Sequence, residues 1–114
     1  MAPELSDPED AKLLVLARAH RVRARAKTGA AVRDTDGRTY SAADVDLPSL
    51  RLSAVQLAVA TAASSGVPGL EAAVVVGADQ LPADDLAAVR DFAGPGVHVY
   101  LADTAGDLVG DRTT

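Results

Sequence analysis

The sequence predicts an α/β fold, a three-layer α/β/α arrangement around a mixed sheet of about five strands. Three observations indicate this fold class. Helical and strand patterns alternate along the chain, a continuous Val-rich run covers residues 70–76, and a turn signal at 34–37 separates two short strand patterns. A length of 114 residues suits one core, so we expect a single domain over 1–114, with loose tails at 1–6 and 110–114.

The first half of the chain is predicted to form a helix followed by a β-hairpin. Asp7 and Pro8 make a good helix start, because aspartate caps free backbone amides and proline suits the first turn. Apolar residues at helical spacing continue this helix to about Arg25. Strands at 29–33 and 38–42 then flank an Asp-Thr-Asp-Gly turn, whose glycine can take a positive φ.

The second half is predicted to alternate helices with strands. An Ala-rich helix begins near Ser53 and is ended by Gly66. The Val-rich run after it is typical of a strand that is covered on both faces. A third helix spans about 81–93, with acidic residues in its first turn that the helix dipole favours. A last strand covers 97–101, and a turn and a frayed end follow, with room for a short strand at 108–109.

The composition indicates a protein of the reducing cytoplasm. The chain contains no cysteine, which excludes disulfides, iron–sulfur clusters and cysteine-based zinc sites. Its N-terminus lacks a basic region followed by an apolar run, so we expect no signal peptide. No apolar stretch is long enough to span a bilayer. We therefore expect a soluble, cytoplasmic protein with no membrane partner.

Charge is distributed unevenly along the chain. The net charge of −5 argues against general nucleic-acid binding. Residues 11–33 nevertheless carry seven basic residues and no acid, whereas the chain from Ser41 onward carries ten acids against three basic residues. The predicted basic patch consists of Arg18, Arg21, Arg23, Arg25 and Lys27. It indicates an acidic or phosphate-bearing partner, or the acidic half of a subunit. Alternatively, it is a solvated helix face whose arginine stems cover apolar surface.

Several short motifs resemble those of one family in their order and spacing. Gly-Ala-Ala-Val at 29–32, followed by Asp-Gly at 36–37, resembles the Val-Gly-Ala-Ala hairpin of small cytidine deaminases. Asp-Val-Asp at 44–46 stands where that family has Asn-Val-Glu, and Ser-Ser-Gly at 64–66 resembles the Ser-Glu-Gly that closes its zinc-bearing helix. Three later motifs also resemble the family, namely Phe-Ala-Gly-Pro at 92–95, Val-Tyr-Leu at 99–101 and Gly-Asp at 106–107. The resemblance covers most of the chain and implies the fold of the small homotetrameric zinc enzymes.

The sequence departs from the family pattern at the residues that carry the family's chemistry. The family holds zinc through Cys-Ala-Glu or His-Ala-Glu at the start of the second helix and Pro-Cys-x-x-Cys at the third. Counting back from Gly66 places Ser-Ala-Val at 53–55 on the first motif, whereas counting forward from Asp44 places Val-Gln-Leu at 55–57 there. The second motif falls at 81–86, where the proline remains and both cysteines are missing. We therefore expect a degenerate member with no metal, no cofactor and no catalytic residue.

Four residues mark the place of the family's pocket, namely Asp44, Asp46, Ser53 and Val55. Asp44 and Asp46 replace residues that contact the ribose in the family. They are either ligand-binding residues or solvated acids that cap the following turn. Ser53 is either the relic of a ligand position or the N-cap of the second helix. Val55 either lines an open pocket or fills it with an apolar side chain.

The leading functional hypothesis is a catalytically inactive cytidine deaminase-like protein that acts as a scaffold or binding partner. One alternative is a nucleoside- or nucleotide-binding module that uses the former pocket. Another is an accessory factor in RNA metabolism that uses the basic first helix. The second helix is apolar on almost every face between Leu57 and Ala63, which predicts a buried helix and a homodimer or homotetramer. The resemblance implies the same, since that helix packs at the centre of the family's tetramer.

Overall fold

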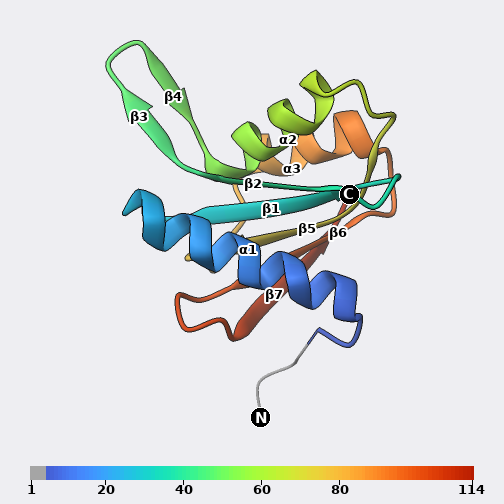
Figure 1. Ribbon diagram of the computed structural model, residues 1–114, viewed down its shortest axis with the longest axis horizontal. Helices are drawn as coiled ribbons and strands as arrows, with labels where there is room; N and C mark the ends of the chain where they lie inside the picture. The colour runs from blue at the N-terminus through green and yellow to red at the C-terminus, as the bar shows by residue number, and fades with distance from the viewer. Residues whose placement is uncertain (1–4) are drawn as a thin grey trace.

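The computed structural model describes residues 5–114, which form three helices and seven strands (Figure 1). The helices are α1 (Pro8–Ala24), α2 (Ala54–Ser64) and α3 (Ala83–Ala93). The strands are β1 (Gly29–Asp34), β2 (Thr39–Ala43), β3 (Val45–Leu47), β4 (Leu50–Leu52), β5 (Leu70–Val76), β6 (His98–Ala102) and β7 (Leu108–Thr113). None of the three helices is long and apolar enough to cross a membrane.

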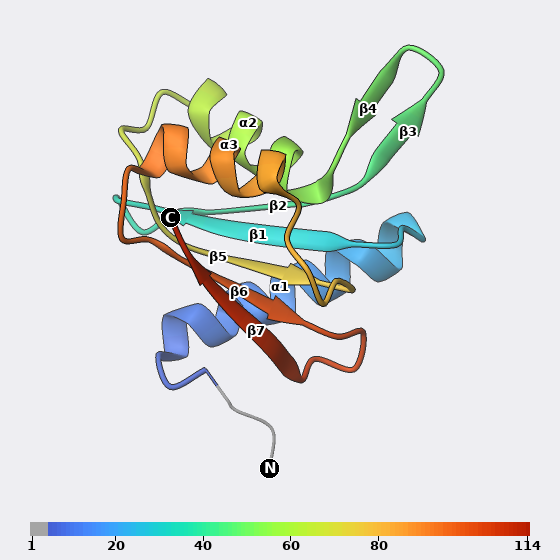
Figure 2. The same ribbon diagram turned by 180° about the vertical axis from the view of Figure 1, so that it is seen from behind.

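Five strands form one mixed sheet in the order β2-β1-β5-β6-β7. β5 and β6 run parallel, while the other neighbours in this sheet run antiparallel. α1 covers one face of the sheet, and α2 and α3 cover the other face (Figures 1 and 2). The predicted three-layer α/β/α fold with a mixed sheet of five strands is therefore confirmed.

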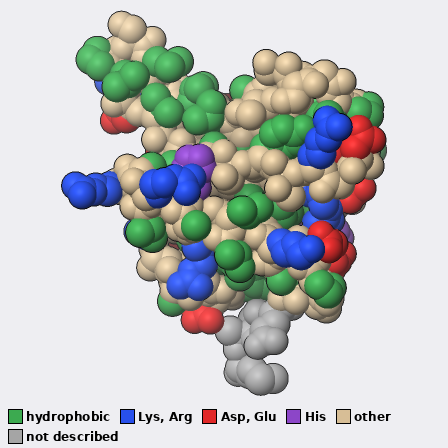
Figure 3. Space-filling model, viewed as in Figure 1, with side chains coloured by type: hydrophobic (Ala, Val, Ile, Leu, Met, Phe, Trp, Pro, Cys, Tyr) green, Lys and Arg blue, Asp and Glu red, His purple; other side chains and the backbone are tan. Residues whose placement is uncertain are grey.

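β3 and β4 form a separate two-stranded arm that projects from the body of the molecule (Figure 1). The sequence analysis expected only a helix in residues 47–65, beginning near Ser53, and so it missed the arm. Leu47 and Leu50 at its tip are 53% and 49% exposed, so the arm has no buried face of its own. Apolar side chains gather on it in the space-filling view (Figure 3). Because no alternation of buried and exposed residues marks these strands, pattern reading had no signal to detect.

α1 approaches β1 closely at Gly29. Leu13 and Ala17 are fully buried in the layer between this helix and the sheet. A Cβ atom on Gly29 would lie only 2.3 Å from the backbone oxygen of Ala17, so a side chain does not fit at this point. The helix begins as predicted, because the Asp7 carboxylate accepts a hydrogen bond of 2.8 Å from the amide of Glu9.

A buried arginine ties α1 to the sheet. The side chain of Arg33 is 9% exposed, and its Nη2 lies 2.9 Å from Oδ1 of Asp10 in α1. Its Nε donates a hydrogen bond of 2.9 Å to Oε2 of Glu71 in β5. Within the described residues, Nη1 of Arg33 has no hydrogen-bond partner. The guanidinium is therefore neutralised by two carboxylates from two different elements, which links the helix to two strands.

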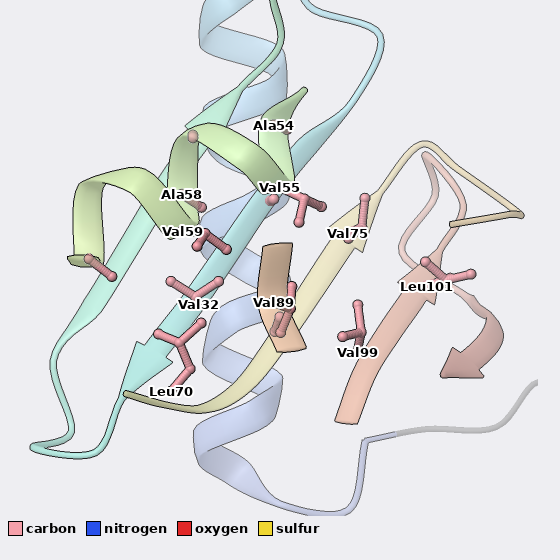
Figure 4. Close-up of a cluster of buried hydrophobic side chains, with 14 of the residues drawn as sticks. Val32, Ala54, Val55, Ala58, Val59, Leu70, Val75, Val89, Val99 and Leu101 are labelled. Carbon is pink, nitrogen blue, oxygen red and sulfur yellow. The ribbon is translucent and has the colours of Figure 1, made fainter. Parts of the chain in front are cut away.

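The layer on the other face holds the larger hydrophobic cluster, in which α2 and α3 pack on the sheet (Figure 4). Val55 and Val59 of α2 and Val89 of α3 are buried there with Val32 and Val75 of the sheet. These side chains are small or β-branched, as expected for a chain with only three aromatic residues. Short side chains let the helices lie close to the strands, so the first turns of α2 and α3 are brought near the end of β5.

The C-terminal residues are ordered as a strand, which corrects the expected loose tail at 110–114. β7 pairs with β6 from Leu108 to Thr113. The amide of Thr114 donates to the oxygen of Val97 over 2.9 Å, and its Oγ1 donates to the oxygen of Gly94 over 2.6 Å. The prediction failed because backbone pairing rather than an apolar pattern holds this strand. The expected tail at 1–6 falls mostly on residues 1–4, which lie outside the described residues.

Candidate functional site

A cavity of about 350 Å³ lies where the first turns of α2 and α3 meet the carboxyl end of β5. Its polar lining comes from Lys27, Thr28, Asp44, Ser53, Asp79, Gln80 and Asp85. Its apolar lining includes Ala54, Val55, Val75 and Leu81. Of the four predicted pocket residues, the structure brings together Asp44, Ser53 and Val55 here. Val55 is buried in the wall, and the space beside it is open rather than filled.

Ser53 joins the two helix N-termini that border the cavity. It is the N-cap of α2, as one of the two sequence hypotheses held, and its Oγ accepts a hydrogen bond of 3.0 Å from the amide of Gln56. The Gln56 side chain in turn accepts from the amide of Ser53, which completes a capping box. The same Oγ donates a hydrogen bond of 2.8 Å to Oδ1 of Asp85 in the first turn of α3.

Asp85 is the buried acid of the cavity, with an exposed fraction of 6%. Burial raises the pKa of its carboxyl group, and the hydrogen bond from Ser53 opposes that shift. The nearby carboxylates of Asp44 and Asp84 raise the pKa further. Only one of its oxygens, Oδ1, accepts a hydrogen bond from the described residues. The second oxygen, Oδ2, is not one of the buried unsatisfied atoms of the described residues, so it faces the open space of the cavity.

Asp44 directly follows β2, and both of its carboxylate oxygens accept hydrogen bonds from the protein. Its Oδ1 accepts from the Thr28 hydroxyl and, over 2.9 Å, from the amide of Ala54 in α2. Its Oδ2 accepts from the amide of Thr28 over 2.9 Å. These contacts fasten the segment before β1 to the start of α2. The geometry favours a structural role for Asp44, although its side chain borders the cavity.

Asp46 lies outside this cavity, in a wider hollow of about 840 Å³ beneath the arm. Its Oδ1 is 3.0 Å from Nε of Arg51, its cross-strand neighbour, and both side chains are largely exposed. Arg25 and Lys27 line the same hollow. The hollow and the cavity share Lys27, Asp44 and Ser53 in their linings, so they are adjacent.

The residues of the predicted basic patch have different surroundings. Arg25 and Lys27 face the hollow beneath the arm, whereas Arg18 approaches Gly106 in the turn between β6 and β7. Nε of Arg21 donates to the backbone oxygen of Lys27 over 3.1 Å. On the face seen in Figure 3, Lys and Arg side chains lie in separate groups with apolar side chains between them. Within residues 5–114, none of the five forms an ion pair.

The two histidines lie away from the cavity. Nδ1 of His20 in α1 is 2.8 Å from Oγ of Ser41, and burial together with the charge of Arg23 lowers the pKa of this imidazole. His98 in β6 stacks on Tyr100 and lies 3.2 Å from Oδ1 of Asp111. Neither imidazole lines the space between α2 and α3.

Residues 6–106 match the family model described as cytidine deaminase-like. The chain belongs to the cytidine deaminase-like family. Its fold is similar to that of a cytidine deaminase from Burkholderia pseudomallei, at 25% identity and a TM-score of 0.76, covering 91% of this chain and 90% of that one. A cytidine deaminase from Mycobacterium leprae has 22% identity and a TM-score of 0.70, with 94% of each chain covered. One from Mycobacterium tuberculosis has 24% identity and a TM-score of 0.70, covering 82% and 85%. No curated protein sequence matches the chain.

In this cytidine deaminase-like chain, the first motif, counted back from Gly66, lines the cavity through Ser53, Ala54 and Val55, whereas Ala83 and Leu86, which stand at the two missing cysteines, do not line it. Ser53 stands at the first position when the motif is counted back from Gly66, and Asp85 lies between the two positions where cysteines are missing. Sequence reading identified Asp85 as a first-turn acid, and it missed the contribution of this residue to the cavity. That contribution depends on how closely α2 approaches α3, which no local pattern encodes. Lys27 and Thr28 were missed as lining residues for the same reason.

Proposed function

We propose that this protein is a non-catalytic member of the cytidine deaminase-like family that retains the cavity as a binding site. The observation that carries the proposal is the hydrogen bond between Ser53 and Asp85. It spans the two helix N-termini where the family resemblance places the zinc ligands. A hydroxyl that donates to a carboxylate takes the place of metal–thiolate bonds as the connection between α2 and α3.

The residues at the cavity do not fit a catalytic zinc ion. Such a site needs three protein ligands and an open position for water. The motif positions supply Ser53, Ala83 and Leu86, of which only the first carries a polar side chain. Within residues 5–114, no three or more His, Cys, Asp or Glu side chains are grouped so that they would hold a metal ion. Val55 stands at the glutamate position in the same register, so a proton shuttle is missing as well.

A binding role agrees with the space that remains. The cavity lining combines apolar side chains with a largely buried carboxylate, as is typical of small-molecule sites. An accessory role in RNA metabolism receives less support, because the basic side chains are dispersed over the surface. We propose the cytoplasm as the location, since the chain contains no cysteine.

Self-association is a second element of the proposal, and the surface of α2 favours it. Val55 and Val59 face the core, whereas Ala60 and Ala63 lie on the outer side of the helix and are exposed. The arm exposes two leucines nearby in the sequence. Apolar surface at both places would be buried in a homodimer or homotetramer. Size-exclusion chromatography with light scattering distinguishes these states from a monomer.

The decisive experiment measures zinc and turnover on the same purified protein. The protein is prepared with and without added zinc, its metal content is determined by mass spectrometry, and cytidine and deoxycytidine deamination are followed by absorbance. The Burkholderia pseudomallei cytidine deaminase is the positive control. We expect no stoichiometric zinc and no turnover above the uncatalysed rate. Bound zinc at one per chain, together with turnover, would overturn the proposal.

A further inference from the structure

We infer that the cavity between α2 and α3 binds a small organic cation with N–H donors, such as an amidinium or a primary ammonium group, through Asp85. This inference rests on the proposed non-catalytic function, because a zinc ion at the same place would compete for the same space. The proposed ligand does not follow from the family's zinc-binding motifs, because Asp85 is not one of the motif positions.

The first argument is the unused hydrogen-bonding capacity of Asp85. The residue is only 6% exposed, and its Oδ2 is not one of the buried unsatisfied atoms, so this oxygen is accessible from the cavity. Ser53 supplies one donor to Oδ1, and no described residue donates to Oδ2. Asp85 borders the cavity, so a ligand inside it can supply the missing donors. An N–H group of a cation is the strongest donor for a carboxylate.

The second argument is the sign of the charge around the cavity. Its lining carries the carboxylates of Asp44, Asp79 and Asp85 and only one cationic group, the ammonium of Lys27. Asp44 is hydrogen-bonded by neutral groups alone, so its charge is not cancelled. An anionic ligand would meet this excess of negative charge at close range, whereas a cation is attracted by it.

The third argument is the size and the apolar part of the lining. A volume of about 350 Å³ lies at the lower end of the range for small-molecule sites, so it suits a small ligand. Val55, Val75 and Leu81 form an apolar wall, which suits a compact hydrocarbon or aromatic body beside the cationic group. The ligand class is therefore a small amphipathic cation rather than a strongly hydrated metal ion.

The test uses benzamidine as the probe and benzamide as its neutral counterpart, both titrated at pH 7.5 into the ¹⁵N-labelled full-length chain. We expect benzamidine to shift the amide signals of Val55, Gly77 and Ala78, and benzamide to bind at least about tenfold more weakly. Asp85→Asn keeps the acceptor for Ser53 and removes only the charge. Its affinity for benzamidine should fall by at least about tenfold.

Asp91→Asn is the matched control, because it makes the same charge change on an exposed residue of α3 that does not line the cavity. It should leave the affinity unchanged. Equal binding of benzamidine and benzamide, or an undiminished affinity in Asp85→Asn, would overturn the inference. So would the absence of any shift with benzamidine, even if the zinc and turnover measurements come out as expected, and the two proposals therefore fail separately. Circular dichroism confirms that each variant is folded.

Discussion

The hydroxyl of Ser53 donates a hydrogen bond of 2.8 Å to Oδ1 of Asp85, and so connects the start of α2 to the start of α3. The same oxygen accepts from the amide of Gln56 and caps α2. The Ser53 side chain therefore has two roles: it caps the N-terminus of α2, and it links α2 to α3. In this cytidine deaminase-like chain, the link joins the two helix starts to which the motif resemblance assigns the family's zinc-binding motifs.

Ser53→Ala, which removes the hydroxyl, should therefore lower the stability of the protein more than the loss of an ordinary N-cap does. Loss of an N-cap costs about 0.5–2 kcal/mol. Leaving a buried acceptor without its donor costs a further ~1–3 kcal/mol. We expect the free energy of unfolding, measured by urea titration, to fall by about 1.5–5 kcal/mol in total. Ser64→Ala, at the exposed C-terminal end of the same helix, is the control and should change it little. Equal effects of the two substitutions would contradict the assigned role.

Asp85→Asn should show a stabilisation that grows as the pH rises. Because burial raises the folded-state pKa of Asp85 above 3.8, folding favours its protonated form. The contribution of the carboxyl group to stability is then complete below the unfolded pKa and is lost as the pH rises through the folded pKa. Asparagine does not titrate. The difference in unfolding free energy, variant minus wild type, should increase between pH 3.5 and pH 7. A difference that stays constant with pH would refute the raised pKa.

Arg33→Met should be far more destabilising than the same change at Arg51. The substitution leaves the buried carboxylate of Asp10 without its cation, and breaking a buried pair costs about 3–5 kcal/mol. Arg51 pairs with Asp46 on the exposed arm, where a surface ion pair contributes about 0–1 kcal/mol. Chemical denaturation of both variants in the same buffer measures the contrast. Similar losses in the two variants would show that Arg33 is not effectively buried.

Much of the fold was accessible from the sequence, because local signals agreed with the tertiary structure. Asp7 and Ser53 cap the helices they were predicted to begin, and the Val-rich run became the central strand β5. The arm was not accessible, and of β7 only a short strand at 108–109 was expected. Leu47 and Leu50 are apolar yet exposed, and β7 is held by backbone pairing to β6. Neither segment carries a periodicity that separates a buried face from an exposed one.

The residues of the candidate site likewise fall into those that the sequence indicated and those that it did not. Counting the motif along the chain put Ser53 and Val55 at the start of the second helix, and both residues line the cavity. Asp85 was missed because its importance comes from a contact across 32 residues of sequence. Asp44 was interpreted either as a ligand-binding residue or as a cap of the following turn, and the structure shows its oxygens bonded to Thr28 and Ala54. Sequence alone does not reveal which polar groups are already satisfied.

Tyr40→Phe should move acid unfolding to higher pH, the opposite direction from the effect of Asp85. Asp34 has no exposed surface, and burial alone would raise its pKa. Hydrogen bonds from the Tyr40 hydroxyl and from the amides of Arg38 and Asp36 outweigh burial and lower the pKa below 3.8. A carboxyl group with a lowered pKa contributes stability above the unfolded pKa and loses it as the pH falls through the folded pKa.

Without the Tyr40 hydroxyl, the pKa of Asp34 rises toward its ordinary value, so this stability is lost at a higher pH. The midpoint of acid unfolding, followed by far-ultraviolet circular dichroism, should therefore shift upward in Tyr40→Phe. Tyr100→Phe is the control, because Tyr100 makes no contact with Asp34. It removes a phenol of similar burial and should leave that midpoint nearer the wild-type value. A shift to lower pH in Tyr40→Phe would mean that the hydrogen bond of 2.7 Å does not stabilise the ionised carboxylate.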